Sequence, residues 1–252
     1  MLLEISNLHK SFGPISALRG VDLGLHAGEV LAVVGDNGAG KTTLIKHVSG
    51  VYRADLGEIR LNGMALELHS PADARRLGIE TVYQDLALAD ELSVGANIFL
   101  GREPVRRWLG VLPMIDKRKI RSETDALLTR IESHIPPNAR TVSRLSGGQR
   151  QAVAIARALY WQAKVVILDE PTAALAVMER DHVIQLAHRL AGEGVGVIYI
   201  GHNLIEILEV ADRIAVMFQG RIVHVTPAAQ TTQQELIKYM TGFSEMAEPM
   251  AG

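Results

Sequence analysis

A glycine-rich run is the stretch of this chain whose residue types and spacing point most clearly to chemistry. The run matches the spacing G-x-x-x-x-G-K-[ST] and stands between a buried aliphatic segment, residues 30–34, and a helical pattern. Its glycines allow a tight turn with inward N–H groups, and the helix N-terminus that follows favours an anion. We therefore expect a cradle for nucleotide phosphates, the alternative being a turn that only closes a βα unit. The residues expected to form it are Gly35, Asp36, Asn37, Gly38, Ala39, Gly40, Lys41, Thr42 and Thr43.

Lys41 and Thr42 carry the side chains that such a cradle needs. At these positions a lysine reaches the terminal phosphates, and a threonine hydroxyl ligates Mg²⁺. Adenine is favoured over guanine as the base because the sequence has no N-K-x-D motif. The run thus predicts a site for ATP and Mg²⁺, with Lys41 as a catalytic and binding residue.

Polar residues also follow three other aliphatic segments. Asp169 and Glu170 come directly after residues 165–168, and His202 and Gln84 each follow a further predicted strand. Because the carboxyl ends of parallel strands meet at one edge of a sheet, we expect these side chains to lie near the cradle. The alternatives are that the two acids only cap the next helix and that the histidine is structural.

This set of residues describes phosphoryl transfer from a nucleotide to water. Asp169, Thr42 and Gln84 are expected to hold Mg²⁺, with the glutamine bridging the metal and the attacking water. Glu170 is expected to orient and deprotonate that water, and His202 to hydrogen-bond the terminal phosphate. The sequence therefore predicts a nucleotide hydrolase.

The alternation of strands and helices predicts an α/β fold with a mostly parallel sheet. Residues 2–8 and 21–25 look like antiparallel strands added at an edge of that sheet, and residues 57–63 look like a strand that ends in an Asn-Gly turn. Between 86 and 162 the periodicity is helical, which predicts an inserted helical subdomain. We expect one domain, residues 1–243, with a core of 1–85 and 163–243, and a frayed tail at 244–252.

The composition limits the possible classes of partner. The chain has 252 residues, 48% of them hydrophobic, and no cysteine, which fits a reducing compartment. With a formal net charge of -2, nothing points to nucleic acid as a partner. No signal peptide is evident, and no apolar run approaches the ~20 residues of a membrane span. We expect any membrane association to come through another protein. The basic run 117–121 is interpreted as a solvated helix face, with a contact to a partner or to lipid as the alternative.

A second short motif makes the chain resemble a known family. The run Leu145-Ser146-Gly147-Gly148-Gln149 lies after the cradle and before the paired acids, and in this order it resembles the signature of ABC-type ATPase domains. The resemblance implies a P-loop NTPase fold of ABC type. It also implies that Phe12 stacks on the adenine, that Gln84 lies in a loop facing a membrane subunit, and that His202 is a switch. From the residues alone, core or turn packing is the alternative for Phe12.

The same resemblance implies that two copies act together. Ser146, Gly147, Gly148 and Gln149 of one copy are expected to close over the ATP that Lys41 holds in the other. A serine-glycine turn that leads into a helix is a second anion site, which supports this expectation. ATP would then drive dimerisation, and hydrolysis would reverse it.

Within the family, further segments are similar to ATPase subunits of bacterial monosaccharide importers, the ribose and fructose type. They are Ser49-Gly50-Val51-Tyr52, Tyr83-Gln84-Asp85-Leu86-Ala87-Leu88 and Asn97-Ile98-Phe99-Leu100-Gly101-Arg102-Glu103. This implies an integral membrane permease, a secreted sugar-binding protein, and a place on the cytoplasmic face of the membrane. The alternatives are an importer of another solute, a soluble ABC ATPase that acts on ribosomes or DNA, and a regulator without turnover. Ala176 departs from the family's usual aspartate, which puts the cross-talk between paired sites in doubt.

Overall fold

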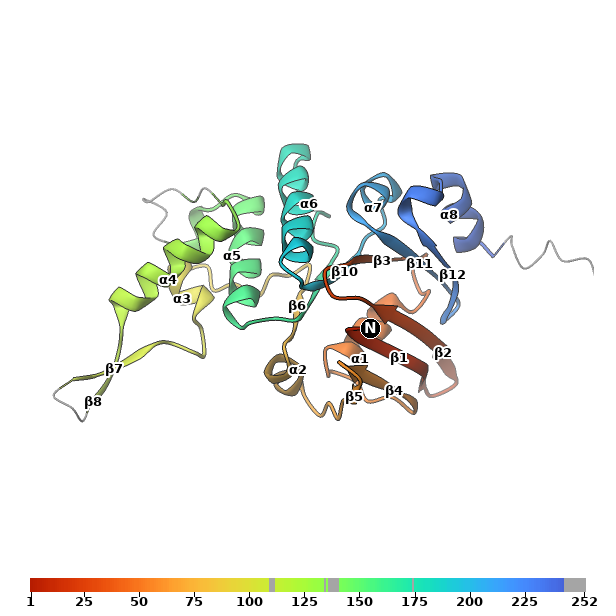
Figure 1. The fold of residues 1–252 in the computed structure, drawn as a ribbon, viewed down its shortest axis with the longest axis horizontal. Helices are drawn as coiled ribbons and strands as arrows, with labels where there is room; N and C mark the ends of the chain where they lie inside the picture. Colours follow the sequence, from red (N-terminus) through yellow and green to blue (C-terminus); the bar gives the residue numbers. More distant parts are fainter. Residues whose placement is uncertain (109–111, 134, 136–140, 174, 243–252) are drawn as a thin grey trace, which may run out of the picture.

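The computed structural model describes residues 1–108, 112–133, 135, 141–173 and 175–242 (Figure 1). A six-stranded sheet runs through its middle in the order β12-β11-β3-β10-β9-β6. All neighbours are parallel except β12, which pairs antiparallel with β11 at one edge. The central strands are aliphatic and buried on both faces, as in a sheet covered from two sides. The bounds are β3 (Val30–Val34), β6 (Ile79–Val82), β9 (Val165–Asp169), β10 (Gly196–Ile200), β11 (Arg213–Phe218) and β12 (Arg221–Pro227).

The other antiparallel strands form a sheet of their own, in the order β2-β1-β4-β5, rather than an edge of the main sheet. The first two are longer than their sequence pattern predicts, because bulges in the pairing interrupt the alternation of buried and exposed residues. The expected Asn-Gly turn is confirmed, with Asn62 at φ 51° and Gly63 at φ 77°. The bounds are β1 (Leu3–Phe12), β2 (Ile15–Leu25), β4 (Leu56–Leu61) and β5 (Met64–Ala65).

Helices cover the sheets and begin where their capping residues predict. Ser70 accepts a hydrogen bond from the Asp73 N–H at the start of α2, with Pro71 in the first turn. Thr232 and Glu235 form the predicted capping box of α8. The bounds are α1 (Lys41–Val48), α2 (Pro71–Leu77), α6 (Val177–Gly192), α7 (Leu204–Val210) and α8 (Gln233–Met240), with a 3₁₀ turn, η2, at Ala228–Gln230.

The inserted helical subdomain stands to one side of the sheet (Figure 1). It holds α3 (Val94–Ile98), α4 (Lys117–Arg130), α5 (Gly147–Tyr160) and the short turn η1 (Val142–Arg144). The expectation of helical structure throughout is wrong at one place, where β7 (Val105–Trp108) and β8 (Leu112–Ile115) form a hairpin. Pro104 and Pro113 explain this, because proline disrupts a helix interior but is tolerated in a two-stranded ribbon whose strands are both edges.

The long helix of this subdomain also ends earlier than its sequence predicts, since apolar residues continue at helical spacing from Ile120 to Ile135. Helix α4 stops at Arg130, and Glu132 turns the chain with a φ of 49°. The run Pro136-Pro137-Asn138, whose prolines predict a helix break, and the predicted frayed tail at 244–252 lie outside the described residues. Among the residues that are described, none of the helices combines the length and the apolar character that a membrane span requires.

Candidate functional site

Two glycines of the cradle, Gly35 and Gly40, leave no room for a side chain unless their neighbours move. β3 ends at Val34, and the chain loops back on itself before α1 begins at Lys41. Gly35 has φ 156°, and a Cβ there would lie 2.3 Å from the carbonyl oxygen of Met217. Gly40 has φ 112°, and its Cβ would lie 2.8 Å from the carbonyl oxygen of Ala17. The loop is therefore packed against two neighbouring strands, β11 and β2, as well as being tightly turned.

The start of α1 presents backbone donors toward this loop. Its N-cap is Gly40, and within the described structure no side chain caps the helix. Lys41 folds back over the loop and donates from Nζ to the carbonyl oxygens of Gly35, at 2.6 Å, and Asp36, at 3.1 Å. Uncapped N–H groups beside a lysine ammonium form an anion site. This geometry is compatible with the phosphate cradle, which stays a prediction.

Asp169 and Glu170 face the same cavity as Lys41 and Thr42. The cavity measures about 390 Å³ and is also lined by residues of β2 and of the β11–β12 turn. Burial, and then the neighbouring Glu170 carboxylate, raise the pKa of Asp169, whereas burial lowers the pKa of Lys41. The Asp169 carboxyl group, with the Glu170 carboxylate beside it and the Thr42 hydroxyl in the same cavity, fits a divalent cation, which would relieve the repulsion between the two acids.

Glu170 sits in an unusual backbone conformation that the neighbouring strand holds in place. Its φ is 48°, in the left-handed region, and its N–H donates to the Ile200 carbonyl oxygen at 2.9 Å. A non-glycine residue rarely adopts this conformation, and strain of this kind gathers at active sites. The strain supports the role predicted for this carboxylate.

His202 and Gln84 lie further from the cradle than the sequence pattern suggests. The His202 imidazole Nδ1 is 3.7 Å from Glu170 Oε1. His202 and Glu170 also line another cavity, of about 210 Å³. Neither His202 nor Gln84 lines the cradle cavity. The strand order explains the position of the glutamine: it follows β6, and β9 and β10 stand between β6 and β3. All four strand ends do belong to one sheet, as expected.

Phe12 also lies outside the cradle cavity. It ends β1, is 42% exposed, and packs edge-on against Tyr52 with ring centroids 5.2 Å apart. Ile15, Ser16 and Arg19 of β2 line the cavity instead. The proposed stacking on adenine therefore stays a prediction.

The signature run forms a second, separate site at the start of α5. Ser146 is the N-cap and forms a capping box with Gln149, whose N–H lies 3.4 Å from the serine Oγ. Ser146, Gly148 and Gln149 line a cavity of about 290 Å³ that, among the described residues, shares no lining residue with the cradle cavity. The signature therefore cannot close over its own chain's cradle in this conformation.

Glu179 belongs to this second site, and sequence reasoning missed it. The Ser146 hydroxyl and the Gly148 N–H bond its carboxylate and, in that order, lower its pKa. A Cβ on Gly148 would lie 3.1 Å from the Glu179 Cβ. Its spacing of three residues from Ala176, the N-cap of α6, is the capping-box spacing and could have indicated it. Because alanine has no side-chain acceptor, only the reverse bond forms, from the Ala176 N–H to Glu179 Oε2 at 3.3 Å.

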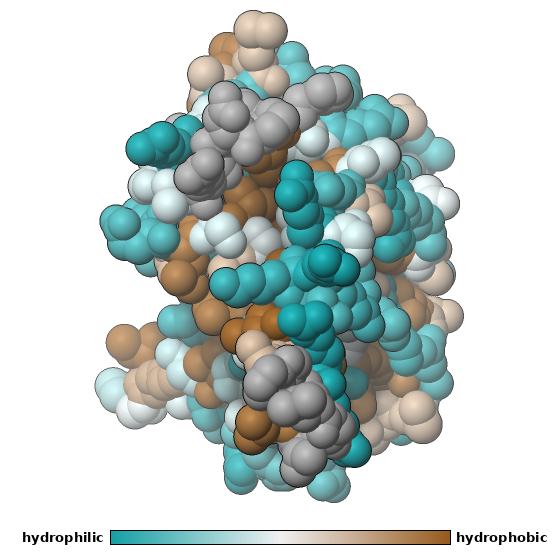
Figure 2. Space-filling model, turned by 90° about the vertical axis from the view of Figure 1, so that its left-hand side faces the viewer, coloured by the Kyte–Doolittle hydropathy of each residue, from teal (hydrophilic) through white to brown (hydrophobic). Residues whose placement is uncertain are grey.

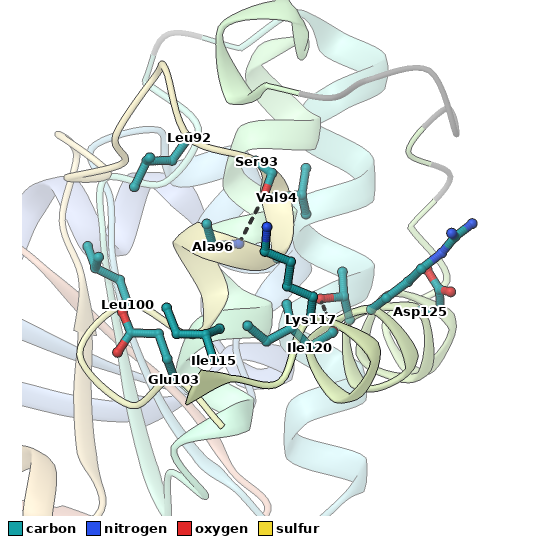
Figure 3. A pocket seen from close by; sticks show the side chains of 13 residues that line it. Leu92, Ser93, Val94, Ala96, Leu100, Glu103, Ile115, Lys117, Ile120 and Asp125 are labelled. Carbon is teal, nitrogen blue, oxygen red and sulfur yellow. Dashed lines mark hydrogen bonds between the residues drawn. The ribbon is translucent and has the colours of Figure 1, made fainter. Parts of the chain in front are cut away.

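A fourth cavity, the largest of the four, lies in the helical subdomain. It measures about 700 Å³ and opens between α3, β8 and α4. Figure 3 shows Leu92, Leu100, Ile115 and Ile120 around it, together with Lys117. Figure 2 shows apolar surface, bordered by polar residues, on this end of the molecule. We call this cavity the subdomain groove.

Comparison with known proteins decides the family. The model of the ABC transporter family matches residues 18–173, a span that runs from β2 through the cradle and signature to the paired acids. This chain belongs to the ABC transporter family. The expected resemblance is confirmed, and with it the ATP-binding, ATP-hydrolysing character of the chain.

The relatives of this ABC protein include subunits named for sugar import. It is 47% identical to the xylose/arabinose import ATP-binding protein XylG of Sulfolobus acidocaldarius, with 96% of this chain and 95% of that protein covered. It is 42% identical to the fructose import ATP-binding protein FrcA of Rhizobium meliloti, covering 97% and 95%. For the ribose import ATP-binding protein RbsA 2 of Streptomyces coelicolor, also 42% identical, 96% of this chain covers only 46% of the relative. The chain thus spans nearly all of the first two and about half of the third.

Solved structures confirm the fold. A nucleotide-free ATP-binding cassette from an ABC transporter superposes with a TM-score of 0.79 at 26% identity, covering 100% of this chain and 99% of that one. The ADP conformation of the cassette MJ1267 gives a TM-score of 0.77 at 26% identity, covering 98% and 99%. The predicted α/β fold of ABC type is therefore confirmed.

Proposed function

We propose that this chain is the ATP-hydrolysing subunit of an importer that moves a monosaccharide through a separate membrane permease. The observation that carries the proposal is the cavity in which Lys41, Thr42, Asp169 and Glu170 meet. The names of relatives that match nearly the whole chain support sugar import. Permease and sugar-binding protein would choose the sugar, while this subunit supplies the energy.

The residues of the cradle divide the work of hydrolysis. The α1 N-terminus and Lys41 bind the phosphates; the Lys41 ammonium has three N–H donors, of which two bond the Gly35 and Asp36 carbonyls. Mg²⁺, held by Thr42 and Asp169, would neutralise charge on the phosphates. Glu170 accepts a proton from the attacking water. Gln84 and His202 reach the phosphate only after a movement toward the cradle, because they lie outside the cavity.

A second copy of the chain would complete each site. The signature cavity and the cradle cavity share no lining residue, so a phosphate in one cradle needs Ser146, Gly147 and Gly148 from another chain. Pairing must also move the Glu179 carboxylate, which already accepts the Ser146 and Gly148 donors. ATP binding would thus join two copies, and hydrolysis would release them.

The subdomain groove is the surface that we assign to the permease. It is mainly apolar, and the hairpin beside it exposes Val105, Leu112, Met114 and Ile115. Exposed apolar patches of this kind mark protein interfaces. Lys117 and Arg121 of the basic run line the groove as well, which favours the partner contact over a purely solvated face. The chain would then sit on the cytoplasmic face of the membrane, held by the permease.

Two experiments test the proposal. The Glu170→Gln variant is expected to bind ATP without turnover and to form a stable dimer on size-exclusion chromatography with ATP. A variant that stays monomeric and hydrolyses ATP normally would contradict the assigned role. Purification of the tagged chain from membranes is expected to recover an integral membrane partner, and Leu100→Asp with Ile120→Asp in the groove should lose it. Recovery with ribosomes or DNA instead would overturn the import function.

A further inference from the structure

The segment directly after Gln84 is tied to the signature helix by an arginine. Residues 86–92, which we call the strap, have no regular secondary structure. Arg157, near the C-terminal end of α5, donates from Nη2 to the Leu86 carbonyl oxygen at 3.0 Å and from Nη1 to the Ala87 carbonyl oxygen at 3.1 Å. One guanidinium thus fixes two successive peptide groups with the planar fork that arginine provides.

The other end of the strap is tied to the entrance of the same helix. Backbone N–H groups of Val142 and Ser143 donate to the carbonyl oxygens of Leu92 and Asp90, both at 3.1 Å. The Asp90 carboxylate forms an ion pair with Arg150 of α5. Val142, Ser143 and Arg150 all lie within four residues of Ser146. The strap therefore follows α5 from its C-terminal part back to the signature turn.

The middle of the strap is held from the side by a buried asparagine. Asn97 of α3 is 0% exposed, accepts the Ala89 N–H at 2.8 Å and donates to the Ala89 carbonyl oxygen at 3.0 Å. Leu86 and Leu88 also pack against a cluster of buried apolar residues that includes Ile98 and Ile155. The strap is therefore attached to both α3 and α5, and Leu92 at its end lines the subdomain groove.

We propose that Arg157 is a positioning residue that locks the strap to the signature helix, so that a displacement at the subdomain groove or at Gln84 moves the Ser146 turn with it. We call the passage of such a displacement to the Ser146 turn the transmission; it rests on the proposed function, in which a permease occupies that groove. We call the attachment of the strap by Arg157 the lock; it does not rest on the proposed function, because it is a property of the isolated chain. Variants of Arg157 measure the coupling between the strap and the Ser146 turn.

The lock is tested by spin labels on the purified chain. Because the natural sequence has no cysteine, Ala87→Cys and Ala126→Cys place one label on the strap and one on α4, both at exposed sites. Arg157→Gln is expected to broaden the distance distribution at least twofold, and Arg157→Lys, which keeps a cationic donor, to restore part of the narrow one. Arg189→Gln, which breaks only the surface ion pair of α6 with Glu132, is the control and should leave it narrow. An unchanged distance distribution in Arg157→Gln overturns the proposal. If that variant does not fold, the same comparison is made with Arg157→Lys alone. Its single ammonium should still widen the distance distribution measurably relative to the natural residue.

The transmission is tested on the complex purified with its membrane partner. Arg157→Gln is expected to keep basal ATP turnover of the isolated chain within twofold, because Arg157 lies outside the cradle, and to lose at least tenfold in partner-stimulated turnover. Full stimulation in a variant with a broadened distance distribution would overturn the transmission. If no partner binds even the natural chain, the proposed function fails, while the spin-label result still decides on the lock.

Discussion

Substitution by alanine should destabilise the protein by different amounts at Gly38 and at Gly40 of the cradle, because the surroundings of the two glycines differ. Gly38 has φ 85°, but a Cβ at this position would have no atom within 4 Å, so Gly38→Ala meets only backbone strain. Gly40 has φ 112°, and its Cβ would meet the Ala17 carbonyl oxygen at 2.8 Å and the Met217 methyl at 2.7 Å. Gly40→Ala therefore meets strain and overlap together.

The sizes of the two effects follow from these contacts. Left-handed strain for a residue with a Cβ costs about 1–2 kcal/mol, which is the whole expected loss of stability for Gly38→Ala. Overlap in a packed region adds about 1–3 kcal/mol, because the Ala17 backbone of β2 must move. Gly40→Ala should thus lose about 2–5 kcal/mol in total. It should also weaken ATP binding more, since the displaced β2 residues line the cavity.

Urea unfolding followed by circular dichroism measures the first quantity, and binding of a fluorescent ATP analogue measures the second. Gly63→Ala, in the β4–β5 turn with φ 77° and no nearby atom, is the control for strain alone. It should resemble Gly38→Ala in stability and leave ATP binding unchanged. Equal losses of stability for the Gly38 and Gly40 variants would refute the argument, because they would show that packing against β2 does not matter.

Three further predictions concern charged residues. Lys41→Ala should abolish ATP binding in a filter assay, and retained binding would contradict its role at the phosphates. Burial raises the pKa of Glu80 from 4.5 to about 7 although Arg75, Arg157 and Arg102 act in the opposite direction, so the folded state keeps a proton that the unfolded state loses. The contribution of this group to stability is full below pH 4.5 and is lost as pH rises through 7, by about 3 kcal/mol. Urea unfolding at pH 5 and pH 8 should show this loss in the natural chain and not in Glu80→Gln. The same pH dependence in both proteins would contradict the role of Glu80. Glu179→Gln should lower the ATP concentration needed for dimerisation about fivefold. The reason is that it removes one surface charge, worth ~1 kcal/mol, that competes with ATP for the Ser146 and Gly148 donors. A higher ATP concentration would show that the carboxylate helps pairing.

Local sequence patterns determined which chemistry the chain offers. Glycine spacing predicted the cradle, and aliphatic runs that end in acids predicted the strand ends at one sheet edge. Capping residues located helix starts at Ser70 and Thr232, because a side-chain cap acts within four residues of the helix start. Proline positions could also have indicated the hairpin at Val105–Ile115, which the helical periodicity around it hid.

Only the tertiary structure decided which residues meet. Strand order along the sheet places β9 and β10 between Gln84 and the cradle, and no local pattern records that order. Packing of α6 against α5 brings Glu179 to the signature turn, and a loop far from α5 in sequence supplies the carbonyls that Arg157 holds. Residue types and short spacings follow from chemistry within a few peptide units, whereas these contacts depend on how distant elements bury their apolar faces together.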